Sequence, residues 1–305
     1  MKKLFFIILY FIVIATYNLF AQPLNVEKLH GLKARSIGPA GMSGRVTAID
    51  VVQKNPSIIY VGTASGGLWK TTSGGIDWKP IFDTMKVASI GAIAIDQNIP
   101  DVIWVGTGEG NPRNSQTSGN GIYKSLDGGK TWIHLGLENS RNIHRIIIDP
   151  RNSDVVYAGV QGSAFGDSDE RGVFKTTDGG KTWQKILYVN ERTGIADLVM
   201  DPSNPNKLFA AMWEFRREPW FFTSGGKGSG LYVTFDGGKT WTKKTDKDGL
   251  PSGELGRIGI AIARSNPEIV YALIEAKVNA LYKSTDGGFN WFKVSDKNIG
   301  DRPFY

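Results

Sequence analysis

The sequence predicts an all-β fold assembled from one four-stranded antiparallel unit that is repeated five times. A motif of Ser or Thr, any residue, Asp, Gly, Gly, any residue, Thr or Asn, and Trp recurs along the chain. Four close copies occupy 125–132, 176–183, 234–241 and 284–291, and a degenerate copy occupies 71–78, so the tryptophans return every 50 to 58 residues. Such a period indicates stacked or radially arranged units. No stretch shows a sustained 3.6-residue apolar period, so almost no helix is expected.

Each repeat contains four short runs that are typical of strands. In the third repeat, the β-branched runs at 145–149 and 154–159 are separated by a polar turn. A Gly-rich connection of variable length leads to a third run, and the Asp-Gly-Gly turn joins that run to a fourth. Four antiparallel strands make one blade of a β-propeller. Because repeat units bury their apolar faces against their neighbours, we expect one continuous array.

The repeats predict five blades, at about 45–88, 89–140, 141–190, 191–250 and 251–298. Residues 22–44 are expected to form a lead-in, and Asp301 to Tyr305 stand where a further blade would begin. Propellers close by pairing their first and last blades, so that no sheet edge is left open. We therefore expect a fragment of a larger propeller with the next blade truncated. A complete ring of five blades is the alternative.

The first residues have the pattern of an export signal. Lys2 and Lys3 precede an almost wholly apolar stretch from Leu4 to Phe20, and Ala21 supplies a small residue at the cleavage site. We expect a signal peptide at 1–21, no membrane span in the mature chain, and a secreted, periplasmic or cell-surface protein. An uncleaved anchor is the alternative, because the apolar stretch only just reaches the spanning length.

Composition argues against several functions. There is no cysteine, so neither a disulfide framework nor a thiolate metal site exists. The net charge of +7 is scattered in single residues, which gives little support to nucleic-acid binding. His30, His134 and His144 are too dispersed for a metal site and are expected to be ordinary surface or strand residues. A solvated turn is favoured over a calcium loop at 167–170, so no metal and no cofactor are predicted.

The chemistry of the repeated motif favours a structural role. Its carboxylate stands at a tight turn, where it can accept hydrogen bonds from the following amides, and its glycines supply positive φ angles. The Trp is expected to pack between sheets. Ser73 replaces the carboxylate in the first copy, which a structural turn tolerates. We assign structural roles to Asp127, Trp132, Asp178, Trp183, Asp236, Trp241, Asp286 and Trp291.

The motif resembles the Asp-box of sialidase-like and sortilin-like propellers, and the resemblance extends from Arg45 to Trp291. Xyloglucan-cleaving glycoside hydrolases share this repeat. The resemblance implies that one catalytic Asp of such hydrolases lies in a Thr-Asp-x-Gly-Gly motif of the first blade, which matches 63–67 here. Ala64 stands at the carboxylate position. The other catalytic Asp belongs to a second propeller that these residues do not include, and a sialidase-type Tyr-Glu pair is not evident.

A candidate ligand surface lies on the face opposite the Asp-box turns. The connections between second and third strands end there and differ most between repeats, as binding loops on a rigid scaffold do. Indole, guanidinium and carboxylate groups suit a sugar stacked on Trp or an extended peptide. The predicted ligand-binding residues are Glu109, Arg113, Asn114, Arg141, Trp213, Glu214, Arg216, Arg217 and Trp220. The longest of these connections is in the fourth blade, at 213–229. Alternatively, Trp213, Phe221 and Phe222 fold this loop onto its own blade, and the arginines pair with Glu214 and Glu218.

The sequence therefore predicts an exported propeller that binds a protein or glycan ligand and does not catalyse a reaction. No catalytic residue is predicted. A glycoside hydrolase acting on a polysaccharide is the alternative. Hydrolysis needs two carboxylates across the bond. The discriminating observation is whether two of Glu109, Asp167, Asp169, Glu214 and Glu254 share one cleft.

Overall fold

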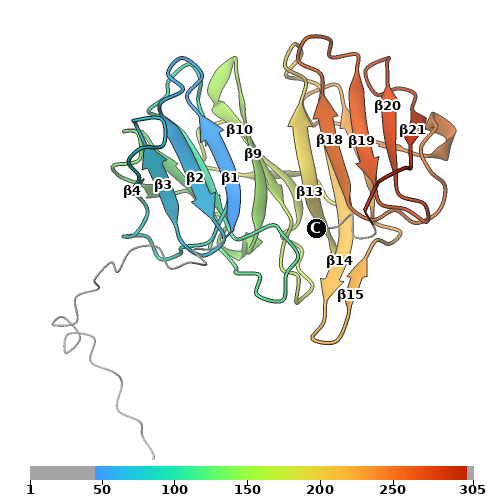
Figure 1. Cartoon of the computed structure of the whole chain (residues 1–305), viewed down its shortest axis with the longest axis horizontal. Coiled ribbons are helices and arrows are strands. Elements are labelled where there is room, and N and C mark those ends of the chain that lie inside the picture. The colour runs from blue at the N-terminus through green and yellow to red at the C-terminus, as the bar shows by residue number, and fades with distance from the viewer. Residues whose placement is uncertain (1–44, 301–305) are drawn as a thin grey trace, which may run out of the picture. The chain divides into compact units, whose positions relative to one another are not determined.

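The computed structural model describes residues 45–300, which form five antiparallel sheets with very little helix (Figure 1). The predicted all-β class of four-stranded antiparallel units is confirmed, and the sheets form a partial β-propeller. The predicted signal peptide, the predicted lead-in and the truncated sixth blade fall on 1–44 and 301–305, outside the described residues.

The strands follow one another through the five sheets in chain order. The first sheet contains β1 (Val46–Val51), β2 (Ile59–Thr63), β3 (Leu68–Thr71) and β4 (Lys79–Pro80). The second contains β5 (Ile90–Ile95), β6 (Ile103–Thr107), β7 (Ile122–Ser125) and β8 (Ile133–His134). The third contains β9 (Ile143–Asp149), β10 (Asn152–Val160), β11 (Gly172–Thr176) and β12 (Gln184–Leu187).

The fourth sheet has an added strand. It contains β13 (Thr193–Met200), β14 (Leu208–Arg217), β15 (Phe222–Ser224), β16 (Gly230–Thr234) and β17 (Thr242–Lys244), and β15 pairs only with the end of β14. The fifth contains β18 (Ile258–Ile262), β19 (Val270–Ile274), β20 (Ala280–Ser284) and β21 (Phe292–Ser295). Within residues 45–300, two short 3-10 helices lie at Glu138–Ser140 and Asp246–Asp248.

The first strand of each sheet lies beside the first strand of the next. Contacts run from β1 to β5, from β5 to β9, from β9 to β13 and from β13 to β18. Each sheet is a meander whose first strand is at one edge, so these edges line up as the inner strands of successive blades (Figure 1). Every inner strand therefore ends at the same two faces of the array.

Glycines in the second strands allow this close packing. A Cβ atom on Gly62 would lie 2.4 Å from Ile90 of the next blade, and one on Gly106 would lie 2.5 Å from Ile143. Both isoleucines begin an inner strand and are completely buried. A side chain at either glycine would push neighbouring blades apart, because such contacts are far inside van der Waals distance.

The outer faces of the first and fifth sheets remain uncovered by described residues. Leu273, at the next-to-last position of β19, is 41% exposed, although Gly62 and Gly106 at that position of their strands are packed against the next blade. Ile49 on β1 is 62% exposed, and Trp78 is 38% exposed. That the array continues past five blades stays a prediction. Exposed apolar faces of this kind are suited to packing against a further blade.

The Asp-box turns are held by hydrogen bonds within the motif. In the third blade, the buried Thr176 hydroxyl accepts from the Gly180 amide at 2.9 Å and donates to Asp178 at 2.7 Å. Asp178 also accepts from the amide and hydroxyl of Thr182 at 3.0 Å and 2.6 Å. These hydrogen bonds lower the pKa of Asp178, with that from the Thr182 hydroxyl contributing most. Gly179 and Gly180 have φ of 72° and 96°, which favours glycine.

The tryptophan of the same motif contacts the preceding blade. The Trp183 indole donates to the Leu135 carbonyl at 2.8 Å, and its ring meets Trp104 edge to face at 6.1 Å between centroids. The motif therefore closes a turn and attaches one blade to the next.

We predict that Thr176→Val lowers the free energy of unfolding by about 1–3 kcal/mol, because it leaves the buried Gly180 amide without an acceptor. Asp178→Ala is expected to lower the free energy of unfolding as well, with little change in ligand affinity of the folded protein. Lys181→Ala, in the exposed part of the turn, is the matched control. Urea unfolding of the three variants checks this, and unchanged stability in Thr176→Val would contradict it.

Candidate functional site

The face opposite the Asp-box turns carries the loops that follow second strands and precede first strands. On this face, β14 and β15 extend beyond the other strands as a hairpin (Figure 1). The loop of 108–121 in the second blade and the segment of 250–257 before β18 also reach this face. We call it the loop face.

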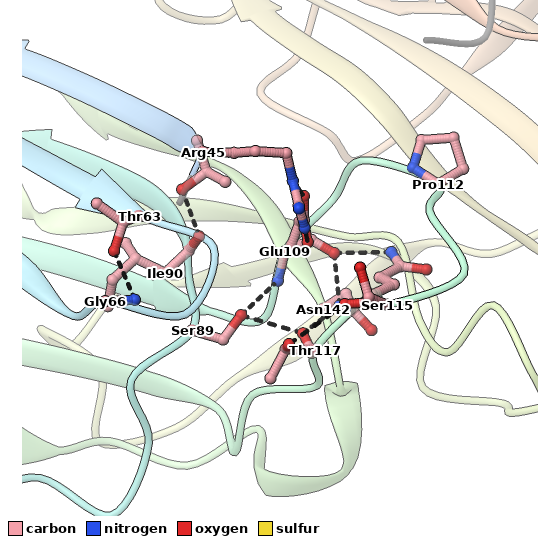
Figure 2. A network of polar contacts seen from close by, with 12 residues as sticks. Arg45, Thr63, Gly66, Ser89, Ile90, Glu109, Pro112, Ser115, Thr117 and Asn142 are labelled. Atoms are coloured by element: carbon pink, nitrogen blue, oxygen red, sulfur yellow. Dashed lines mark hydrogen bonds and ion pairs between the residues drawn. The ribbon is translucent and has the colours of Figure 1, made fainter. Parts of the chain in front are cut away.

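Glu109 lies at a junction of three blades (Figure 2). Its carboxylate accepts from Arg45 Nε at 2.8 Å and from Arg45 Nη2 at 2.5 Å. The hydrogen bond that Arg45 donates to Glu109 raises the pKa of Arg45. The Glu109 carbonyl accepts from Asn142 at 2.6 Å and from Gln116 at 2.7 Å. Glu109 is fully buried, so this predicted ligand-binding carboxylate joins blades and presents no surface to solvent.

Trp213 is also fully buried. Its ring stacks on Phe215 with 4.4 Å between ring centroids and meets Phe222 edge to face with 5.9 Å between centroids. The Arg257 guanidinium lies 5.4 Å from the same indole. For Trp213 and Phe222, the alternative that this loop folds onto its own blade therefore describes the packing.

The arginines of the hairpin connect it to other blades. Arg216 forms an ion pair with Asp167 of the third blade, although the sequence suggested pairing with Glu214 or Glu218. The Arg217 amide donates to the Ala164 carbonyl at 2.9 Å, and its guanidinium donates to the Pro112 carbonyl at 3.0 Å. These contacts fix the hairpin against the second and third blades.

The remaining predicted residues reach the surface of the loop face. Trp220 is 78% exposed at the tip of the hairpin, and its neighbour Phe221 is 50% exposed. The tip is closed by a hydrogen bond from the Glu218 amide to the Phe221 carbonyl at 2.8 Å. Exposed or half-buried side chains here are those of Arg113, Asn114, Arg141, Glu214 and Arg217.

A cluster around His144 was not predicted from the sequence, which assigned this histidine to an ordinary surface or strand position. It lies buried in β9, with Nε2 3.2 Å from Arg145 Nη1 and 3.3 Å from Arg257 Nη2. Arginine only donates, so Nε2 accepts and the proton is on Nδ1. Burial, with the charges of Arg145 and Arg257, keeps the pKa of His144 well below its ordinary value. Burial and the charge of Arg145 also lower the pKa of Arg257 to about 10.

Two pockets whose linings both include residues 252–255 lie between the fourth and fifth blades. One, of about 380 Å³, is lined by Lys227, Lys243 and Thr245 among others. The other, of about 630 Å³, is lined by Glu254 and Glu275. Two carboxylates therefore share one pocket, although Glu275 was not among the residues singled out from the sequence.

Ala64 is buried, and its amide donates to the Arg45 carbonyl at 2.9 Å. In the turn that follows, the Gly66 amide donates to the Thr63 hydroxyl at 2.8 Å (Figure 2). The position that resembles the hydrolase motif thus holds a buried methyl group.

Within 45–300, no group of three or more His, Asp or Glu side chains is arranged to hold a metal ion. In that same part of the chain, the structure contains no helix with the length and apolar character needed to cross a membrane.

The comparisons with known proteins confirm the resemblance to sortilin-like and xyloglucanase-related propellers. A family model described as sortilin, neurotensin receptor 3, matches residues 120–254. A xyloglucanase of Paenibacillus sp is 24% identical over 258 residues, which are 75% of this chain and 23% of the relative. A xyloglucanase of Hypocrea jecorina (strain QM6a) is 26% identical over 239 residues, or 68% and 27%. The chain thus spans about a quarter of the length of these relatives.

Solved structures show the same fold at low identity. An ancestral GH74 enzyme has a TM-score of 0.61 at 20% identity, covering 85% of this chain and 32% of that one. The GH74 xyloglucanase of Xanthomonas campestris has a TM-score of 0.53 at 15% identity, covering 88% and 47%. The GH74 enzyme of Niastella koreensis has a TM-score of 0.50 at 20% identity, covering 83% and 51%. These likenesses show a propeller fold.

We predict that stability decreases as the pH falls from 7 to 5, in part because of His144. The unfolded chain takes up a proton near pH 6.5, whereas the folded protein holds His144 neutral. At pH values below 6.5, the free energy of unfolding therefore decreases, and this group contributes up to about 1.4 kcal/mol per pH unit. His144→Gln, whose amide oxygen can accept from both arginines, should flatten this slope in urea unfolding. An identical slope in both proteins would contradict the assignment.

Proposed function

We propose that this chain binds a polysaccharide on its loop face, with the tip of the β14–β15 hairpin as the main contact. The observation that carries the proposal is the pair of exposed rings, Trp220 and Phe221, on a projecting hairpin. Large aromatic side chains dominate binding energy when an interface removes them from water. Exposed indole also suits sugar rings, which have an apolar face and polar edges.

The hairpin is fixed before any ligand arrives. Strand pairing joins Phe215 to Ser224 and Arg217 to Phe222, and the Arg216–Asp167 ion pair attaches it to the third blade. A fixed binding segment loses little conformational entropy on association. The neighbouring guanidinium and amide groups of Arg113 and Asn114 are exposed and can donate to hydroxyl oxygens.

The two xyloglucanase relatives support a glycan ligand over the peptide alternative. They also favour the second candidate, a glycoside hydrolase. Because Ala64 places a methyl group where the resemblance predicts a carboxylate, such activity would need another pair. Glu254 and Glu275, which line one pocket, are the pair that the described residues offer.

Export is proposed with this function, on the pattern of Lys2, Lys3 and the apolar stretch that follows.

We predict that Trp220→Ala weakens binding of a xyloglucan oligosaccharide by at least about 1–2 kcal/mol, because it removes the exposed indole. Lys181→Ala, in an Asp-box turn, is the control and should leave affinity unchanged. Isothermal titration calorimetry gives both affinities. A loss in the control with no loss in Trp220→Ala would place the ligand on the opposite face.

We predict no cleavage of xyloglucan above background by the purified protein, because no carboxylate stands at position 64. Reducing-sugar release after prolonged incubation is the measurement. Release that disappears in Glu254→Gln or Glu275→Gln would reject binding without catalysis and identify the second candidate as the function.

A further inference from the structure

The pocket of about 630 Å³ between the fourth and fifth blades is lined mostly by small residues. Its lining includes Ser224, Gly225, Gly253 and Gly256. A Cβ atom on Gly256 would lie 2.1 Å from Glu275 Oε2, so only glycine leaves room for the carboxylate at this place. The shape of the pocket thus depends on Glu275 occupying one position.

The Glu275 carboxylate is held there by a chain of hydrogen bonds that begins in the core. The buried Trp213 indole donates to the Ser224 hydroxyl at 3.0 Å, and that hydroxyl donates to Glu275 Oε2 at 2.6 Å. The Arg257 amide donates to the same oxygen at 2.7 Å. Trp213 therefore acts through Ser224 to orient Glu275, although it presents no surface itself.

The backbone of Glu275 is fixed as well. Its amide donates to the Arg257 carbonyl at 3.0 Å, and its carbonyl accepts from the Gly256 amide at 2.8 Å. Both bonds on the carboxylate reach Oε2, and Oε1 has no hydrogen-bond partner among the described residues. A carboxylate oriented in this way offers acceptor positions to a ligand before binding.

We infer that this pocket is a second subsite, which recognises the hydroxyl groups of a glycan through Glu275. Among the described residues that line it, none is aromatic, so recognition there depends on hydrogen bonds and not on stacking. Glu254 and Lys277 on the rim add an acceptor and a donor. This inference rests on the proposed function, and it adds a site distinct from the aromatic tip.

The spacing of the two sites suits one extended ligand. Ser224 ends β15 at the pocket, and Trp220 is at the other end of the same segment, four residues earlier. Residues 222–224 of this segment form β15, so the chain runs from the tip directly to the pocket. A glycan chain stacked at the tip can therefore extend toward Glu275.

The test measures the affinity of the full chain for cellotetraose and for a xyloglucan heptasaccharide by calorimetry. Glu275→Gln keeps the shape of the side chain and removes its charge, and it should weaken binding about tenfold to a hundredfold. Glu268→Gln is the matched control, because Glu268 is exposed near the opposite end of β19, and it should bind as the wild type does. If Glu275→Gln has a much lower melting temperature than the wild type, Glu275→Asp is used in its place. This variant keeps the charge but moves it back from the pocket, and it should weaken binding to the same extent.

Ser224→Ala tests positioning. If Ser224 acts through Glu275, Ser224→Ala weakens binding in the otherwise wild-type protein. In the Glu275→Gln background, the same substitution causes little further loss of affinity. Unchanged affinity in folded Glu275→Gln, with Trp220→Ala still weakened, would overturn the subsite and leave the proposed function standing. A wild-type protein that binds neither oligosaccharide would overturn both.

Discussion

The close contact between an isoleucine of one blade and a glycine of the blade before it is the constraint on which the array depends. Ile90 and Ile143 open inner strands and lie on Gly62 and Gly106 with no room for a side chain there. This contact sets neighbouring inner strands side by side, so their ends reach two common faces. Loops from blades that are far apart in sequence meet for that reason.

The two faces differ in how their polar groups are satisfied. In the Asp-box turns, a carboxylate such as Asp178 accepts from its own turn, and the hydroxyl of Thr176 both donates and accepts within the motif. Such groups are already paired and have little to offer a ligand. On the loop face, Trp220 is exposed and Glu275 Oε1 has no hydrogen-bond partner among the described residues. The paired polar groups of the turns and the groups that we propose for ligand binding thus lie on different faces.

The sequence predicts the fold well because each blade repeats one local pattern, and it predicts the site only in part. A strand and a turn depend on near neighbours, so the Asp-box turns and the four-stranded sheets follow from spacing. The burial of Glu109 depends on Arg45, 64 residues away, and His144 meets Arg257 across 113 residues. Such pairings follow from the arrangement of blades. For the same reason Trp213 could be mistaken for a ligand contact, and Glu275 could be overlooked.

Hydrogen exchange of the full chain, with and without a xyloglucan oligosaccharide, tests most directly the claim that the loop face binds a glycan. Mass spectrometry of peptic fragments reports which amides become protected. We predict slower exchange in 213–230 and 252–257 and unchanged exchange in the Asp-box turns at 125–132 and 176–183. Protection confined to those turns, or absent everywhere at saturating oligosaccharide, would contradict the claim.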